Sequence, residues 1–198
     1  MLFRSGNFWT DPELTDYINA ARQRTVRDTG CLRELQSFTA NTNQEVYTFT
    51  ADLPKGDRTL DVLNINLYWG NARTPLRYLA WTDFNAQLRY WQNYIGVPIA
   101  YSQYGQNKFY IQPVPQQEYQ CEADTVILPL DLTSSTDVDE IIDPYTTPVA
   151  YYACYKAKYK EQSFGEAEIF KQEYLKHVQA ALTSTFTRRM PTPYSTPY

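Results

Sequence analysis

Histidine is nearly absent from this chain of 198 residues, which contains only His177. General acid/base sites, catalytic triads and zinc sites normally use histidine, so none of these is expected. We interpret His177 as a surface residue of the last helix, beside Lys176. The seven glycines are scattered at predicted turns and form no phosphate-binding loop. The sequence therefore predicts a protein that is not an enzyme and that holds no metal and no cofactor.

Cysteine is also scarce, with Cys31, Cys121 and Cys154 far apart in the chain. An odd number of cysteines without a CxxC pair argues against a disulfide framework and against a zinc site. We expect all three to be reduced and buried.

Long hydrophobic runs are missing as well. No stretch of eighteen apolar residues occurs, which predicts that nothing spans a membrane. The segment 1–10 has one basic residue and lacks the apolar core and cleavage site of a secretory signal. We expect the protein to stay in the cytoplasm of the cell that makes it.

Acidic residues are densest at Asp137, Asp139, Glu140 and Asp143. The pattern lacks the glycine and the terminal glutamate of a calcium-binding helix-loop-helix. We interpret these carboxylates as favourable charges at the start of a helix. A catalytic pair of carboxylates brought together from distant strands stays open at this point.

Apolar and aromatic residues are plentiful, at 43% and 16%, which predicts a sizeable core. The net charge of −4 predicts no bulk attraction to nucleic acid. Seven aromatic residues in the middle of the chain form either part of this core, which we favour, or a stacking platform for sugars or single-stranded bases. They are Trp81, Phe84, Tyr90, Trp91, Tyr94, Tyr101 and Tyr104.

Helical periodicity occurs towards both ends of the chain. A capping sequence at Thr10 and an apolar stripe predict a helix over 12–29, closed by Gly30. The same spacing predicts helices over 149–163 and 166–182, separated by Gly165.

Alternation of apolar and polar residues predicts strands in the middle of the chain. The runs 46–53 and 59–69, joined by a turn at 54–57, read as a hairpin that buries Leu63, Ile65, Leu67 and Trp69 on one face. Further expected elements are a strand over 76–81, a helix over 84–94, and strands over 99–104, 108–112 and 119–128.

This order of elements predicts an α+β fold, in which N- and C-terminal helices form a bundle and carry a β-rich insertion. The expected segments are the first bundle helix in 1–40, the insertion with one helix in 41–135, the remaining bundle helices in 136–182, and an extended arm in 183–198.

The arm 183–198 is the one segment with a net positive charge. Its closely spaced prolines forbid a helix and favour an extended, polyproline-like chain. Arg188, Arg189, Tyr194 and Tyr198 look like anchor residues for a partner. A frayed terminus without a function is the alternative.

Four stretches in this order resemble the head-to-tail adaptor (connector, or head completion) proteins of tailed bacteriophages, especially short-tailed ones. They are LTDYINAAR at 14–22, TNQEVYTF at 42–49, FYIQPVPQ at 109–116, and VAYYACYKA at 149–157 followed by Gln162, Ala167 and Tyr174. The resemblance covers about residues 11–180.

The resemblance implies a homo-oligomeric ring of twelve copies in the virion at the head-tail junction. One side of the ring docks on the portal protein, the other receives the tail tube or nozzle protein, and DNA makes transient, non-specific contact in the channel. By position in the chain, it implies that Arg188, Arg189, Pro191, Tyr194 and Tyr198 bind the portal.

Two other classes of function remain open at the level of sequence. Exposed tryptophan and tyrosine side chains would suit a carbohydrate-binding or other tail-associated binding module. A phage-associated wall hydrolase would need an accessible carboxylate pair or an activated cysteine.

Overall fold

The computed structural model of the chain describes residues 9–90, 94–134 and 136–184. No helix within these ranges is long and apolar enough to cross a membrane. The predicted arm falls, from residue 185 onward, outside the described residues.

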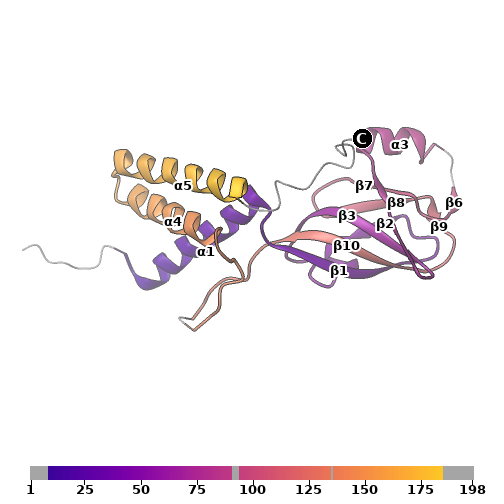
Figure 1. The fold of residues 1–198 in the computed structure, drawn as a ribbon, viewed down its shortest axis with the longest axis horizontal. Coiled ribbons are helices and arrows are strands. Elements are labelled where there is room, and N and C mark those ends of the chain that lie inside the picture. Colours follow the sequence, from indigo (N-terminus) through magenta and orange to yellow (C-terminus); the bar gives the residue numbers. More distant parts are fainter. Residues whose placement is uncertain (1–8, 91–93, 135, 185–198) are drawn as a thin grey trace, which may run out of the picture. The chain divides into compact units, whose positions relative to one another are not determined.

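The structure is mixed α+β, as the sequence predicts, and the chain divides into two compact units (Figure 1). Residues 33–128 make up one of them, called here the β unit. Residues 1–32 and 129–198 make up the other, called here the helical unit. The chain therefore enters the β unit once and leaves it once.

Helix α1 (Asp11–Thr29) of the helical unit begins and ends where the sequence predicts. The Thr10 side chain accepts a hydrogen bond from the Glu13 amide, and the Glu13 carboxylate accepts one from the Thr10 amide at 3.0 Å. This capping box satisfies two amides that have no partner inside the helix. At the other end Gly30 has a φ of 61°, a left-handed conformation that glycine adopts without strain.

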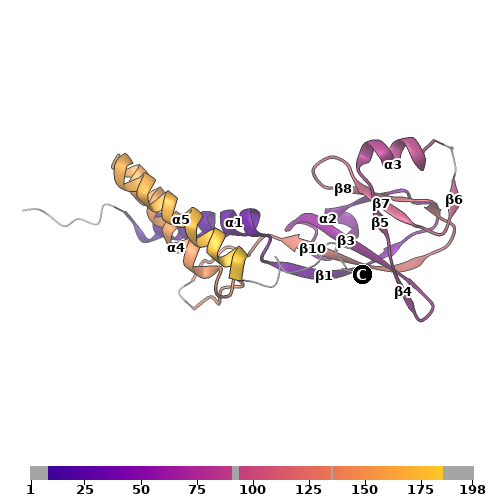
Figure 2. The same ribbon diagram turned by 45° about the horizontal axis from the view of Figure 1, so that its top comes forward.

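Helices α4 (Thr146–Lys160) and α5 (Phe164–Ser184) confirm the two helices predicted near the C-terminus. They lie side by side in both views, and α1 packs against α4 (Figure 1, Figure 2). Tyr174 of α5 is buried, and its hydroxyl donates a hydrogen bond to Asp28 of α1 at 2.7 Å. The three helices therefore contact one another within one unit.

The described part of the β unit contains two four-stranded sheets, one pair of short strands and two short helices. The first sheet has the order β1 (Arg33–Ala40), β10 (Tyr119–Ile127), β3 (Thr59–Trp69) and β4 (Ala72–Pro75). The second has the order β2 (Val46–Thr48), β8 (Lys108–Gln112), β7 (Ala100–Gln103) and β5 (Arg77–Tyr78). The remaining elements are β6 (Ile95–Gly96), which pairs with β9 (Val114–Pro115), and helices α2 (Phe49–Asp52) and α3 (Trp81–Gln87).

Both four-stranded sheets contribute to one apolar core. Phe109 of β8 is fully buried at its centre, with ring centroids 5.2 Å from Tyr47 and 5.4 Å from Phe38. Phe38 belongs to the first sheet and Tyr47 to the second, so these aromatic contacts join the two sheets. The core explains why the chain needs so many aromatic residues.

The predicted hairpin of 46–53 with 59–69 is wrong. Strand β2 ends at Thr48 and pairs with β8, whereas β3 pairs with β10 and β4 in the other sheet. Between them Phe49–Asp52 forms one helical turn, in which the Asp52 carboxylate accepts a hydrogen bond from the Thr48 amide at 2.6 Å. A Cβ on Gly56 would lie 1.6 Å from the Phe49 carbonyl oxygen, so this compact turn needs glycine there. Local hydrogen bonds thus override the alternating pattern.

The predicted buried face of β3 is only half right. Ile65 and Leu67 are buried, but Leu63 and Trp69 are 43% and 48% exposed. The pairing register with β10 skips Leu63, because Asp124 opposes Asn64 while Thr125 already opposes Val62. An extra residue of this kind is a β-bulge, and it reverses which side chains face the core. Val62 is therefore buried in place of Leu63.

Three of the other predicted strands are confirmed as β7, β8 and β10. The predicted strand 76–81 is wrong, since only the two residues of β5 pair there. The predicted helix 84–94 is also wrong in its bounds, because α3 begins at Trp81 and ends at Gln87. Strand β1 was not predicted from the sequence at all.

Candidate functional site

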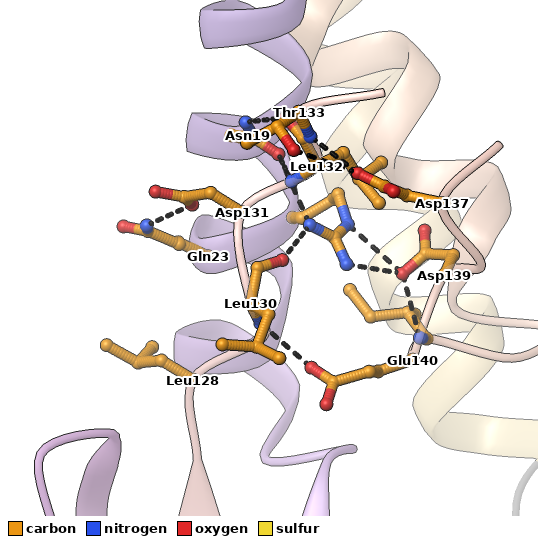
Figure 3. Close-up of polar contacts among 12 residues, drawn as sticks. Asn19, Gln23, Leu128, Leu130, Asp131, Leu132, Thr133, Asp137, Asp139 and Glu140 are labelled. Carbon is orange, nitrogen blue, oxygen red and sulfur yellow. Dashed lines mark hydrogen bonds and ion pairs between the residues drawn. The ribbon is translucent and has the colours of Figure 1, made fainter. Parts of the chain in front are cut away.

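Arg22 is the most deeply buried charge in the described part of the helical unit, with 1% of its surface exposed. Its Nε and Nη2 donate to Asp139 Oδ1 at 3.0 and 2.7 Å, and its Nη1 donates to the Leu130 carbonyl at 2.6 Å (Figure 3). Nη1 also donates to Asn19 Oδ1 at 3.2 Å. A buried guanidinium with these partners is satisfied, whereas the same group without Asp139 would be an uncompensated charge. Arg22 therefore fixes the segment 129–140 to α1.

The same segment is tied to α1 by two neutral side chains as well (Figure 3). Asn19 accepts a hydrogen bond from the Leu132 amide at 2.9 Å and donates one to the Leu132 carbonyl at 3.0 Å. Gln23 Nε2 donates to Asp131 Oδ1 at 3.1 Å. This segment thus follows one face of α1 through polar contacts.

The acidic stretch 137–143 makes hydrogen bonds and an ion pair that the sequence did not predict. Asp137 accepts hydrogen bonds from the Thr133 and Ser134 amides at 2.7 and 2.8 Å, which lower the pKa of its carboxyl. Glu140 accepts one from the Leu130 amide at 2.8 Å, while Asp139 pairs with Arg22. The interpretation as helix-start charges is therefore wrong for these three residues, since helix α4 begins only at Thr146.

Side chains that could bind a metal ion do not cluster in the described residues. No set of three histidine, cysteine or acidic side chains there could hold a metal ion. His177 is half-buried rather than on the surface, and its ring stacks on Tyr151 with centroids 4.5 Å apart. Its position is explained by packing between α4 and α5.

The three cysteines are free thiols, as expected, but only Cys121 is buried. Burial raises the pKa of the Cys121 thiol to about 12, and partial burial also raises the pKa of Cys31. Cys154 is exposed on α4, so the expectation of three buried cysteines is wrong.

The aromatic cluster of the β unit packs on itself. Trp81 stacks on Tyr104 with centroids 4.3 Å apart and also contacts Phe84 and Tyr110. The Arg89 guanidinium lies 5.2 Å from the centroid of the Trp81 ring, which adds a cation–π contact. These neighbours argue that Trp81 is a structural residue and not part of an open stacking platform.

Other members of that cluster have different environments. Tyr101 is buried and its hydroxyl donates to the Leu63 carbonyl at 2.8 Å, and burial raises its pKa. Tyr90 and Tyr94 are 73% and 43% exposed, and Trp91 lies outside the described residues. The seven residues therefore do not form one site.

An apolar groove lies between α1 and α4, with a volume of about 420 Å³. The α1 side is formed by Leu14, Tyr17 and Ile18, of which Leu14 and Ile18 are 37% and 39% exposed. The α4 side consists mainly of small residues, Ala150, Ala153, Cys154 and Ala157. An open apolar surface of this kind on a small unit is typical of a protein–protein contact.

An acidic hollow of about 480 Å³ adjoins the same helix on its other side. Asp11 and Asp16 of α1 and Asp131 of the following segment line it. Within the described ranges no basic side chain is at ion-pair distance from Asp11 or Asp16. The groove and the hollow are therefore separate surfaces on two sides of α1.

The site residues predicted from the sequence are Arg188, Arg189, Pro191, Tyr194 and Tyr198, and all five lie outside the described residues. The groove was missed because Leu14 and Ile18 form a regular apolar stripe, which predicts core. The small residues in VAYYACYKA, which leave little bulk to cover that stripe, were the available signal.

Comparison with known proteins adds an independent finding. The model of the SU10 adaptor protein family matches residues 2–197, nearly the whole chain. A search of proteins with curated descriptions found no match. The resemblance to phage head-to-tail adaptors is therefore confirmed, and this chain belongs to the SU10 adaptor protein family, whose members have a structural role in the virion of bacteriophages.

Proposed function

We propose that this protein forms a ring of twelve copies below the portal, joins the capsid to the tail, and lets DNA pass during ejection. The family match over residues 2–197 supports a head-tail role. The observation that carries the assembly is the open apolar groove of the helical unit, since a structural virion protein covers such a surface with a partner. Identical copies close into a ring when each contributes two different, complementary faces.

In this proposal the C-terminal arm contacts the portal through Arg188, Arg189, Pro191, Tyr194 and Tyr198. Arginine and tyrosine are enriched at the centres of protein interfaces. An extended segment can also follow a groove on a partner without needing a core of its own.

The channel of the ring lets DNA pass without holding it. The net charge of −4 favours this, because a protein that neutralised many phosphates would bind DNA tightly. The protein is made in the host cytoplasm and ends at the head-tail junction, and the tail tube or nozzle protein occupies the side of the ring away from the portal.

Native mass spectrometry of the purified chain with the portal ring of its phage tests this proposal. We expect addition of one adaptor copy per portal subunit. A chain truncated after Ser184, the last residue of α5, should lose portal binding, while a chain with residues 185–198 in scrambled order separates the effect of sequence from that of length and charge. A full chain that ignores the portal, or a truncated chain that binds it normally, would contradict the corresponding part of the proposal.

A further inference from the structure

Two large apolar side chains project into water from the segment that links β10 to α4. Val138 and Ile142 are 88% and 75% exposed, more than any other large apolar side chain within the described ranges. Aliphatic side chains in water forgo the favourable free energy of burial. Two of them on one short loop of a small unit are typical of a contact with a partner.

The loop that carries this pair is fixed in place before any partner binds. Asp139, which lies between the two, accepts hydrogen bonds from the buried Arg22 at 3.0 and 2.7 Å and from the Ile141 amide at 2.9 Å (Figure 3). Ile141 itself is buried, with 3% of its surface exposed. A segment that is ordered in advance loses little conformational entropy on binding, so Val138 and Ile142 are suited to anchor a contact.

The groove between α1 and α4 has the complementary chemistry. Leu14 and Ile18 form one wall, and the other wall consists mainly of small residues, so space is left for aliphatic side chains from elsewhere. Lys156 lies beside the groove, with its Nζ 6.0 Å from the centroid of the Tyr17 ring, which lines it. No carboxylate of the described residues is at ion-pair distance from Lys156. An occupant that combines aliphatic side chains with a carboxylate satisfies this surface.

Asp143 supplies such a carboxylate directly beside Ile142. It is exposed, and its side chain accepts a hydrogen bond from the Thr146 hydroxyl, which does not neutralise its charge. Among the residues that the structure describes, no basic side chain forms an ion pair with Asp143. The loop thus presents two aliphatic side chains together with an uncompensated negative charge.

The loop cannot occupy the groove of its own copy as far as Lys156. Asp143 is held at the start of α4 by Thr146, and Lys156 lies ten residues further along that helix, a rise of about 15 Å. Moving the loop over that distance would break the buried pair of Arg22 with Asp139. Both the loop and the groove are therefore available to a second copy of the chain.

We propose that Val138 and Ile142 of one copy enter the α1–α4 groove of a neighbouring copy, where Asp143 pairs with Lys156. This inference rests on the proposed ring and names the contact that closes it. Loop and groove are different surfaces of the same unit, so each copy inserts its loop into one neighbour and receives the loop of the other. A head-to-tail contact of this kind closes into a ring.

Cysteine cross-linking in the portal-bound ring tests the contact. A chain with Ile142→Cys, prepared as an equal mixture of unlabelled and isotope-labelled protein, is treated with a short bis-maleimide. We expect the introduced thiol to join Cys154, which is exposed and lines the groove, in pairs of one labelled and one unlabelled peptide. Leu35→Cys, at an exposed position of the β unit, is the control and should not join Cys154. Cross-links only within single chains, or equal yields for the two variants, would overturn the proposal.

The size of the products tests the head-to-tail arrangement. Because each copy has both a loop and a groove, the cross-linked Ile142→Cys chain should give a ladder of covalent oligomers longer than dimers. Products that end at dimers would mean that two copies exchange loops with each other, and would contradict the head-to-tail contact.

Exchanged charges test the ion pair. In the Ile142→Cys chain, Lys156→Gln should slow cross-linking by up to about fivefold at low salt, as expected for loss of one exposed ion pair. Lys156→Asp should slow it further, and adding Asp143→Lys should restore the rate. Lys176→Gln, at a lysine that pairs with Glu173 on its own helix, is the matched control and should have no effect. A loss that the exchanged charges do not rescue would contradict the pairing of Asp143 with Lys156.

Failure of this inference and failure of the ring give different results. A ring on the portal that forms without the cross-link to Cys154 would overturn the loop–groove contact and leave the ring intact. A chain that ignores the portal, yet forms the same cross-link between copies in concentrated solution, would support the contact and contradict the ring.

Discussion

The β unit and the helical unit bury their apolar side chains to different degrees. In the β unit, Tyr47, Phe109 and Ile111 are fully buried in a core shared by two sheets. In the helical unit several of the buried apolar residues are small, such as Ala21 and Ala167, while larger apolar side chains remain partly exposed.

In the helical unit, polar contacts add to the apolar packing that joins its segments. The segments of the helical unit are joined by the Arg22–Asp139 pair, the Tyr174–Asp28 hydrogen bond and the Glu13–Lys160 pair. Such contacts fix geometry but contribute modest net stability. The β unit is therefore held mainly by its own core, whereas the helical unit would gain stability from any partner that bound its open groove.

Removing a core side chain from the β unit should give the largest loss of stability. Phe109→Ala deletes a fully buried ring that contacts Phe38, Tyr47 and Phe49. We expect the free energy of unfolding to fall by about 4 kcal/mol, measured by denaturant unfolding. Leu63→Ala at the exposed bulge is the control and should cost under about 1 kcal/mol, and equal losses for the two variants would contradict the assigned core.

Breaking the buried pair of the helical unit should have a smaller effect. Arg22→Met keeps the length of the side chain but leaves Asp139 without its cation. Asp139 is about one-third exposed, so water partly compensates its charge when the cation is removed. We therefore expect the free energy of unfolding, measured by denaturant unfolding, to fall by about 2 kcal/mol. Arg24→Ala removes an exposed pair with Asp28 and should cost about 0.5 kcal/mol or less. A loss for Arg22→Met as small as this control would contradict the structural role of Arg22.

Acidification should produce the smallest effect, at the start of α1. Hydrogen bonds from Lys160 and from the Thr10 amide lower the pKa of Glu13 from 4.5 to about 2. A carboxyl whose pKa is lowered by folding stabilises the protein above its unfolded pKa and loses that contribution as the pH falls from about 4.5 towards 2.

The variant Glu13→Gln isolates this effect, because glutamine keeps the capping box but removes the charge that Lys160 meets. Thermal melts between pH 6 and pH 2.5 should show the variant less stable than the native chain at pH 6, with a difference that narrows steadily as the pH falls below about 4.5. A difference in melting temperature that does not change with pH would show that the charge of Glu13 is not responsible.

The elements predicted well from the sequence are those whose local signals agree with their packing. Helix α1 has a capping box, an apolar stripe and a closing glycine, and its bounds differ from the prediction by one residue. Strand β8 alternates regularly and was predicted over its actual bounds. The family resemblance, which depends on the order of several short motifs, was confirmed by the match over 2–197.

The elements predicted poorly are those where pairing or burial reverses the local pattern. In β1 the buried residues include the polar Gln36, while Leu35 is 59% exposed, so apolar side chains do not mark the inner face. Gln36 is satisfied inside by Thr59, Thr125 and the Lys55 amide, which come from distant positions in the chain. A local hydropathy pattern contains no information about hydrogen-bond partners that lie far away in the sequence. Arg22 is likewise buried because of distant partners, so its burial could not be predicted either.

The pairing of β1 with β10 has a mechanical consequence. The chain enters the β unit at Arg33 and leaves it just after Ile127, and Arg33 pairs directly with Val126. Tension applied to these two ends would therefore open the β1–β10 ladder from one end, breaking its hydrogen bonds in succession instead of loading them all together. Such a geometry resists force weakly, because the hydrogen bonds of the ladder carry the load one after another.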